Sequence, residues 1–212
     1  MTGNQNSPDS TTLDQVHDLT IYPDYFRAFA KGYMAAWTDD GCPIYQDLML
    51  AADIIPLLTT ITVLDLREPE MARYRFCGSE VVAQTGVDLS GQNLLELVPA
   101  DGRDDLYTDM KAMLACPCGN FSQHLDVYAS GKSVKSESLS LPLKSRPGSP
   151  AGLLITLHGS EWTFLADAQR GALLGDGDLR IGAEWTQSLF VDTGDGTPGP
   201  TAFQRDQAAI NS

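Results

Sequence analysis

The chain has 212 residues, 42% of them hydrophobic, and carries 28 Asp and Glu residues against 14 Lys and Arg residues, for a net charge of −14. This charge argues against a nucleic-acid-binding protein, which would present a basic face. The longest apolar stretch, residues 48–58, is shorter than the roughly 20 residues that span a bilayer and contains Asp53, so we expect no membrane contact.

The two ends of the chain are polar. Residues 1–20 and 200–212 contain few large apolar side chains, so they cannot bury enough surface to offset the entropy of ordering. We predict that both are disordered tails. Residues 1–20 also lack the basic and apolar regions of a secretory signal, and the four cysteines lack a zinc-binding spacing. A reduced, cytoplasmic protein is therefore expected.

An N-terminal helical extension is predicted over residues 21–59. Its first helix, residues 23–38, begins at a proline and repeats aromatic side chains at offsets of three and four. One hypothesis is that this aromatic face joins two copies in a homodimer; the alternative is that it packs on the protein's own sheet. The aromatic residues are Tyr25, Phe26, Phe29, Tyr33 and Trp37.

Residues 60–159 are predicted to form the core of the protein. Strand patterns at residues 61–66 and 73–76 precede short helices near 80–85 and 94–98 and a longer helix at 101–115. Three further strand patterns follow, at 120–128, 134–143 and 152–158. Two strands, a helical segment and three strands predict an α+β fold, in which a five-stranded antiparallel sheet carries the short helices on one face.

The segment 160–199 is predicted to be a C-terminal extension with two apolar patches, around Trp162 and around Trp185. It contains no signature of a kinase, a DNA-binding domain or another output domain. Any signal must therefore leave by contact with a protein partner.

The order of the core elements, together with a motif in residues 74–97, resembles the PAS domain. The resemblance is closest to a stand-alone PAS-like family of alphaproteobacteria, and it covers residues 22–199. It extends to the strand Leu141-Pro142-Leu143 and to the segment from Glu184-Trp185 to residues 190–194. The motif positions are Tyr74, Arg75, Gly78, Ser79, Val81, Val82, Gly86, Asp88, Leu89, Ser90 and Gly91.

The resemblance implies a sensor or protein-interaction module without catalytic activity. In such a module a small ligand lies between the helices and the sheet, where methionines give an adaptable lining. The alternative is that these side chains simply fill a close-packed core. The predicted lining comprises Tyr107, Met110, Met113, Phe121, Leu125, Leu139, Leu141, Ile155 and Leu157.

Histidines offer little support for catalysis or for a cofactor. His124 and Asp126 project to the same strand face, but no nucleophile motif accompanies them. We expect His124 and His158 in a polar pocket or at an exposed rim. The helix at 101–115 has no histidine, unlike many haem-binding PAS domains, and the flavin-binding Asn-Cys-Arg-Phe motif is missing. Haem and flavin are thus not supported, although His124 or His158 could meet a haem from the sheet.

The remaining predictions concern thiols, metals and function. No metal site is predicted, and a redox role for Cys116 and Cys118 would need a lowered thiol pKa. The main hypothesis is a cytoplasmic, non-enzymatic PAS sensor or adaptor that signals through protein contacts, with a small ligand in its core. The alternatives are a small-molecule carrier or enzyme built around His124 and Asp126, and a scaffold without a ligand.

Overall fold

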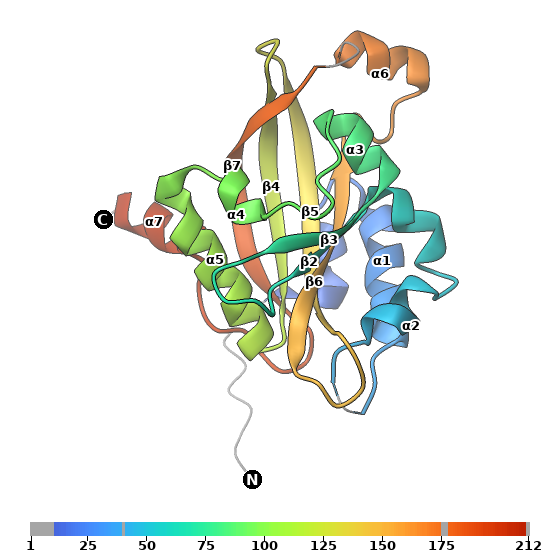
Figure 1. Ribbon diagram of the computed structural model, residues 1–212, viewed down its shortest axis with the longest axis vertical. Helices are drawn as coiled ribbons and strands as arrows, with labels where there is room; N and C mark the ends of the chain where they lie inside the picture. The colour runs from blue at the N-terminus through green and yellow to red at the C-terminus, as the bar shows by residue number, and fades with distance from the viewer. Residues whose placement is uncertain (1–10, 40, 175–177, 211–212) are drawn as a thin grey trace.

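The computed structural model describes residues 11–39, 41–174 and 178–210. Within these ranges the chain forms one curved sheet with helices around it (Figure 1). No helix in the described ranges is long and apolar enough to cross a membrane. The elements are β1 (Thr11–Thr12), η1 (Leu13–Asp18), α1 (Pro23–Ala35), α2 (Tyr45–Met49), η2 (Ile55–Thr60), β2 (Ile61–Asp65), β3 (Arg73–Cys77), α3 (Ser79–Thr85), α4 (Leu94–Leu97), α5 (Ala100–Ala115), β4 (Gly119–Tyr128), β5 (Ser133–Lys144), β6 (Ala151–Ser160), α6 (Asp167–Leu173), β7 (Arg180–Asp192) and α7 (Ala202–Ile210).

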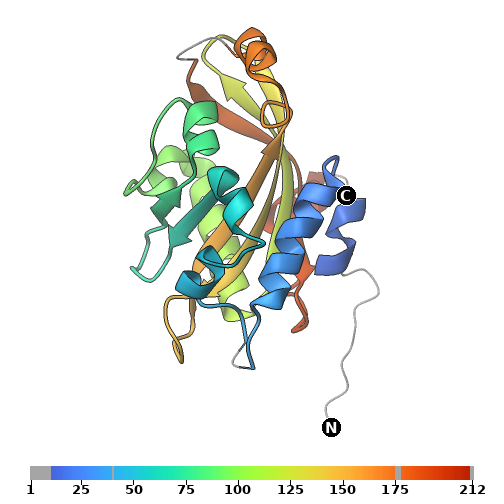
Figure 2. The same cartoon turned by 90° about the vertical axis from the view of Figure 1, so that its right-hand side faces the viewer.

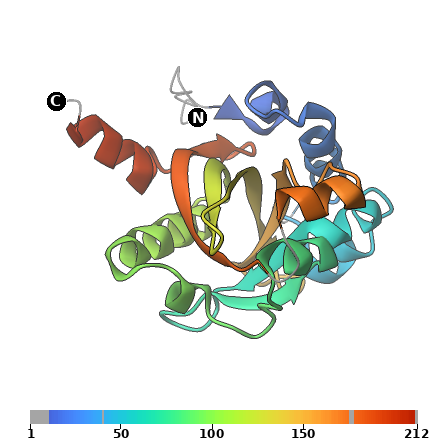
Figure 3. The same ribbon diagram turned by 90° about the horizontal axis from the view of Figure 1, so that it is seen from above.

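The described strands form a seven-stranded sheet in the order β1-β7-β4-β5-β6-β2-β3. Five neighbours in this order, β4-β5-β6-β2-β3, pair antiparallel and are the five strands expected from the sequence. The prediction of a five-stranded sheet is wrong at one edge, where β7 pairs antiparallel with β4 and β1 pairs parallel with β7. Figure 3 shows the strong curvature of this mixed sheet, seen from above.

Strand β7 lies within the segment 160–199 that was expected to be an extension. Most of its residues are exposed or half-buried, and only Phe190 and Val191 are buried. An apolar alternation, the usual sign of a half-buried strand, is therefore weak in its sequence. Its long pairing with β4, from Gly119 to Tyr128, holds it in the sheet.

Helices cover both faces of the sheet, and the short helices of the core lie on one face, as predicted. Figure 2 shows α1 on one side, with α3, α4 and α5 on the other. Successive side chains of a strand point to opposite faces, so each strand contributes to two separate layers. Leu139, Leu141 and Leu157 pack in the layer under α1, whereas Leu64 and Leu154 pack with Met110 and Met113 of α5.

The aromatic face of α1 packs on the protein's own sheet. Phe26, Phe29 and Tyr33 are at most 1% exposed, and Tyr25 and Trp37 are partly buried against the same cluster. The Tyr33 hydroxyl also donates a hydrogen bond of 2.7 Å to the Pro142 carbonyl. The expected dimer surface is therefore corrected: these five side chains are used within one chain, because the α1 layer of the sheet supplies enough apolar partners.

The predicted tails are folded where the structure describes them. In residues 11–20, Leu13 and Val16 of η1 are buried in the layer under α1. The Glu137 carboxylate accepts hydrogen bonds from the Thr20 hydroxyl and the Ile21 amide, which ties this segment to β5. Near the other end, the backbone amide of Ala202, the first residue of α7, donates a hydrogen bond of 2.9 Å to the carboxylate of Asp109 in α5. Disorder was thus the wrong prediction for residues 11–20 and 201–210; residues 1–10 and 211–212 lie outside the described ranges.

Glycines of the 74–97 motif serve two different purposes, a turn at Gly86 and close packing at Gly78. Gly86 ends α3 with a φ of 79°, and Asp88 accepts a hydrogen bond of 2.9 Å from the Ser90 amide. Gly78, which precedes α3, has a φ of −66°, so no positive φ requires a glycine there. A Cβ at this position would lie 2.3 Å from the Thr59 carbonyl oxygen. Gly78 is therefore required for close backbone packing rather than for its conformational freedom.

Candidate functional site

The predicted ligand pocket does not form as one space. Tyr107, Met110 and Met113 belong to the cluster under α5, together with Leu154 and Phe190. The sheet residues expected to face them point to the opposite layer, because strand alternation places odd-numbered positions of β4, β5 and β6 under α1. The residues of the opposite layer are Phe121, Leu139, Leu141, Ile155 and Leu157, with Leu125 at another odd position of β4.

Polar side chains dominate the sheet face under α3 in place of the predicted apolar lining. Two of them pair across neighbouring strands, with 2.7 Å between the hydroxyls of Ser122 and Ser138 and 2.9 Å between Thr62 Oγ1 and His158 Nε2. The even-numbered positions of three strands supply this face. They are Ser122, His124 and Asp126 of β4, Ser136, Ser138 and Ser140 of β5, and Thr156, His158 and Ser160 of β6.

Asp126 is the centre of this polar face and is 3% exposed. Its Oδ2 accepts hydrogen bonds from Ser136 Oγ at 2.5 Å and from Gln84 Nε2 at 3.1 Å. Its Oδ1 lies 2.7 Å from Arg180 Nε and 3.3 Å from His124 Nε2. Burial by itself would raise the pKa of Asp126, but the contacts with His124, Arg180 and Ser136 outweigh burial and hold this pKa below its ordinary value.

Four elements meet at this carboxylate, and β7 closes its outer side. Gln84 comes from α3 and is itself held by a hydrogen bond of 3.0 Å from Ser160 Oγ. The Trp185 ring of β7 covers the His124 ring, with 4.9 Å between centroids. We name these residues the Asp126 cluster; its members are Gln84, His124, Asp126, Ser136, Ser160, Arg180 and Trp185.

His124 of β4 and His158 of β6 both lie on this polar face. The exposed rim expected for His124 is wrong, since the residue is 7% exposed beneath Trp185. His124 Nδ1 is buried and has no hydrogen-bond partner among the described residues. Burial, with the charges of His124 and Arg180, lowers the pKa of His158 to about 3. His158 is therefore neutral at physiological pH, and His124 Nδ1 is left with an unmet hydrogen-bonding capacity.

The geometry of the cluster does not match that of a hydrolase. In a Ser-His-Asp triad the imidazole lies between the hydroxyl and the carboxylate. Here the carboxylate of Asp126 lies between Ser136 and His124, so the Ser136 hydroxyl donates to the acid and not to the base. The arrangement can fix charges and hydrogen-bond a polar molecule, but it does not activate Ser136 as a nucleophile.

The four cysteines are not members of this cluster and are poor nucleophiles, because each has a raised thiol pKa. All four are free thiols. Burial, reinforced by the charge of Asp195, raises the pKa of Cys116, and burial raises that of Cys118 to about 12. Both shifts keep the thiols protonated, which counts against a redox role. Within the part of the chain that the structure describes, no three His, Cys, Asp or Glu side chains are grouped to hold a metal.

Comparison with known proteins gives a family match. A family model described as PAS domain matches residues 46–157, slightly more than half of the chain. The matched segment contains β2, β3, β4, β5 and most of β6, and it excludes α1 and β7. No curated protein matches the chain.

Several solved structures of LOV domains are also similar. The LOV protein of Rhodobacter sphaeroides is 16% identical, with a TM-score of 0.38, over 53% of this chain and 63% of that chain, so less than two thirds of its length is spanned. A LOV domain studied with a flavin analogue is 12% identical, with a TM-score of 0.41, over 58% of this chain and 92% of that chain. The aureochrome1 LOV domain in its light state is 10% identical, with a TM-score of 0.37, over 54% of this chain and 88% of that chain.

Proposed function

Because the chain belongs to the PAS domain family, whose members are typically sensor or signalling modules, we propose that it is a non-enzymatic sensor or adaptor that acts through protein contacts. We place its sensing site at the Asp126 cluster. The observation that carries this proposal is the buried His124 Nδ1, which has no hydrogen-bond partner among the described residues. The same imidazole lies beside the buried carboxylate of Asp126. A small polar molecule that bonds this nitrogen would satisfy it.

A ligand at this cluster could bias the protein between two states. The Arg180–Asp126 contact and the Trp185–His124 contact both join β7 to β4. A ligand that binds more tightly when these contacts are rearranged would shift the position of Arg180 and Trp185, because differential affinity is what moves such an equilibrium. Trp185 is 46% exposed, so such a shift would reach the surface that a partner meets.

The partner and the compartment belong to the same proposal. Four free thiols suit a reducing compartment, which supports a cytoplasmic location.

A homodimer is still proposed as one form of partner contact, but on a surface other than the aromatic face of α1. Light scattering of the full chain tests this point, since a monomeric mass at micromolar concentration contradicts the homodimer.

A ligand-free scaffold is the second candidate, because Asp126 already has close contacts with four protein side chains. Native mass spectrometry and an absorbance scan of the purified protein separate the two candidates. A sensor is expected to carry or acquire a small molecule that is lost in His124→Asn and kept in the control His17→Asn, which lies in η1. A molecule kept in both variants contradicts the site, and a molecule in neither variant nor the parent favours the scaffold.

A further inference from the structure

Strand β7 has an outer edge that is only partly paired. Its neighbours in the sheet are β4 on one side and β1 on the other. Strand β4 pairs with β7 from Arg180 to Val191, whereas β1 has two residues and pairs only with Val191 and Asp192. Among the described residues, no backbone–backbone hydrogen bond outside the ladder with β4 involves residues 180–188. An edge with unpaired N–H and C=O groups is a template for another strand.

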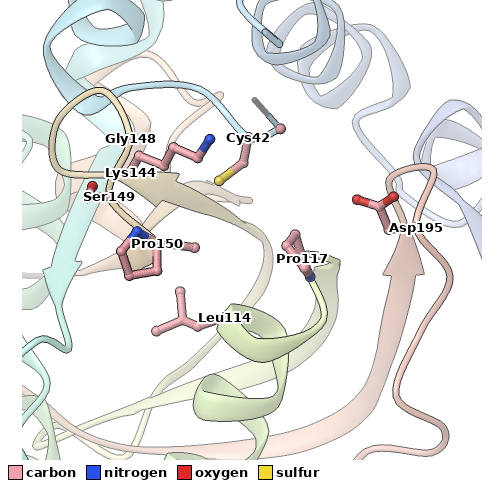
Figure 4. Close-up of a pocket in the computed structure, with 10 residues that line it drawn as sticks. Cys42, Leu114, Pro117, Lys144, Gly148, Ser149, Pro150 and Asp195 are labelled. Atoms are coloured by element: carbon pink, nitrogen blue, oxygen red, sulfur yellow. The ribbon is translucent and has the colours of Figure 1, made fainter. Parts of the chain in front are cut away.

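The C-terminal end of this edge is occupied. Strand β1 covers it at residues 191–192, and the turn that follows brings Asp195 to the rim of a hollow, as Figure 4 shows. The Ser188 carbonyl accepts a hydrogen bond of 3.0 Å from the Thr201 hydroxyl, so the segment before α7 lies beside this part of the strand. The free edge is therefore limited to residues 181–187.

The backbone groups of Ala183 point to the free edge. Alternate residues of an antiparallel strand direct their N–H and C=O groups to opposite neighbours. The Tyr128 amide donates to the Lys132 carbonyl, on the β5 side of β4, so the odd-numbered residues at this end of β4 face β7. Their partners in β7, Gly182 and Glu184, therefore direct their backbone groups to β4. Ala183 lies between these two residues and directs its own groups outward.

Two exposed apolar side chains and a single charge lie along this edge. Ile181 is 67% exposed and Trp185 is 46% exposed. Glu184 is the only charged side chain in the sequence from 181 to 191. A chain with a net charge of −14 repels a second copy wherever carboxylates cluster, so a stretch with one carboxylate favours contact between two copies. A basic partner would instead be expected to prefer a more acidic surface.

Antiparallel pairing of two β7 edges about a twofold axis restricts the register. Residues that face outward must oppose one another, so the axis passes through a residue and not between two residues. An axis at Glu184 would place two carboxylates directly opposite each other, which is unfavourable. An axis at Gly182 would pair Trp185 with Leu179, but the Leu179 carbonyl already accepts a hydrogen bond of 2.9 Å from the Ala129 amide. Both of these registers are therefore less favourable than one centred on residue 183.

An axis at Ala183 makes the edge complementary to itself. It places Ile181 of each copy opposite Trp185 of the other, so the two exposed apolar side chains form a cross-strand pair twice. It also places Glu184 opposite Gly182, which keeps the two carboxylates from facing each other. The outward N–H and C=O groups of the two Ala183 residues can then bond to one another.

We propose that two copies of this chain associate through residues 181–185 of β7, in the antiparallel register centred on Ala183. The same edge serves both copies, as a twofold dimer requires, and the two sheets become continuous. This inference rests on the homodimer of the proposed function and assigns a surface to it. The Trp185 ring also covers His124, so the contact lies beside the Asp126 cluster.

Oxidative cross-linking of cysteine variants tests the register. In Ala183→Cys two thiols oppose each other across the axis, where the Cα atoms of paired strands are about 5.5 Å apart and a disulfide can form. Gln187→Cys is the control, because it lies on the same strand with a similar exposure but far from the axis. With a copper–phenanthroline oxidant at micromolar protein, we expect about tenfold more covalent dimer from Ala183→Cys than from Gln187→Cys or from the parent chain.

Sedimentation measurements of edge variants test the surface. Ala183→Pro removes an N–H that faces outward, a position at which an edge strand tolerates proline, and Ile181→Lys adds a charge that blocks edge pairing. Each is expected to weaken the dimer by about tenfold or more in Kd. The control Leu50→Lys changes a side chain that is 70% exposed after α2 and is expected to leave the dimer unchanged.

Three results would overturn the proposal. They are a monomeric parent chain at micromolar concentration, equal yields of covalent dimer from Ala183→Cys and Gln187→Cys, and an unchanged dimer in Ile181→Lys. If Ala183→Pro does not fold, the exposed Ile181→Lys variant decides alone.

These outcomes are distinguishable from failure of the proposed function. A dimer that persists in Ile181→Lys keeps the homodimer and contradicts only this surface. A monomeric parent chain removes the homodimer and leaves the edge to a strand of another protein. Neither outcome affects the test of the Asp126 cluster with His124→Asn, which detects a small molecule.

Discussion

The ring of Trp185 covers the ring of His124, with centroids 4.9 Å apart and planes tilted by 47°. His124 lies inside the segment that matches the PAS family, and Trp185 lies outside it on β7. The added strand therefore completes the buried polar face of the family core.

The Arg180–Asp126 pair is expected to be strongly coupled. Removing either charge leaves the other one poorly compensated near a buried site, so Arg180→Met and Asp126→Asn should each lower the free energy of unfolding by about 1–3 kcal/mol. A double-mutant cycle measured by urea unfolding should give a coupling of about 1 kcal/mol or more. The exposed Asp24–Arg27 pair is the control and should give less than about 0.5 kcal/mol. Equal coupling in both pairs would contradict the role of burial.

Glu137 is expected to hold the N-terminal segment on the sheet. It is 3% exposed and accepts hydrogen bonds from Thr20, Ile21 and Gln123. Glu137→Gln replaces one acceptor oxygen with a donor and should lower the free energy of unfolding by about 1–3 kcal/mol. Hydrogen exchange should rise first in residues 11–21, whereas the exposed control Glu161→Gln should leave it unchanged. Faster exchange spread evenly over the sheet would show that Glu137 does not act on this segment.

Two glycines are expected to respond in opposite directions to alanine. At Gly78 the added Cβ meets the carbonyl oxygens of Thr59 and Leu58 at 2.3 and 2.4 Å, so Gly78→Ala should destabilise the protein by about 2–4 kcal/mol. At Gly102 in α5 the nearest neighbour is Val98 at 3.9 Å, so Gly102→Ala should stabilise it by about 0.5–1 kcal/mol. Chemical unfolding measures both, and a neutral Gly78→Ala would refute the close-packing explanation.

Acid is expected to destabilise the protein through His158. Its pKa is about 3 in the folded chain and 6.5 ordinarily, so below pH 6.5 the unfolded chain binds a proton that the folded chain does not. The free energy of unfolding should therefore be independent of this group above pH 6.5 and fall below it, by at most about 1.4 kcal/mol per pH unit.

Urea unfolding between pH 4.5 and 7.5 measures this dependence. Asp126 also has a lowered pKa, but the stability that it contributes is lost only below its ordinary pKa, near 4. Between pH 4.5 and 6.5 the change in the free energy of unfolding should therefore come from His158 more than from Asp126. His158→Gln should flatten the curve there, and an unchanged slope would contradict the prediction.

Local patterns in the sequence were sufficient for the five core strands and for the long helix α5. Residues 120–128 and 134–143, for example, alternate over enough positions to mark β4 and β5, and the structure bounds them within a few residues. Positive φ at Gly86 and the turn at Asp88 were also predictable, because turn chemistry is local. The PAS resemblance depended on these same local features.

The candidate site was predictable only in part. That His124 and Asp126 share a face follows from their spacing on one strand, and the structure brings them to 3.3 Å. Gln84, Arg180 and Trp185 were missed, because they come from α3 and β7 and no spacing connects them to β4. Polar residues at alternate positions of β5, Ser136, Ser138 and Ser140, were a signal that one face of this strand is polar.

The sequence by itself determined the elements of the core and their family, since periodicity and turn residues act within a few positions of the chain. Only the tertiary structure decided which layer each strand face meets, and so which side chains form a site. Leu139 and Ser138 are neighbours in β5, yet one packs under α1 and the other lies on the polar face. Residues 180–192 have only a weak strand pattern in their sequence. They form a strand because β4 pairs with them through backbone hydrogen bonds, which is a long-range interaction.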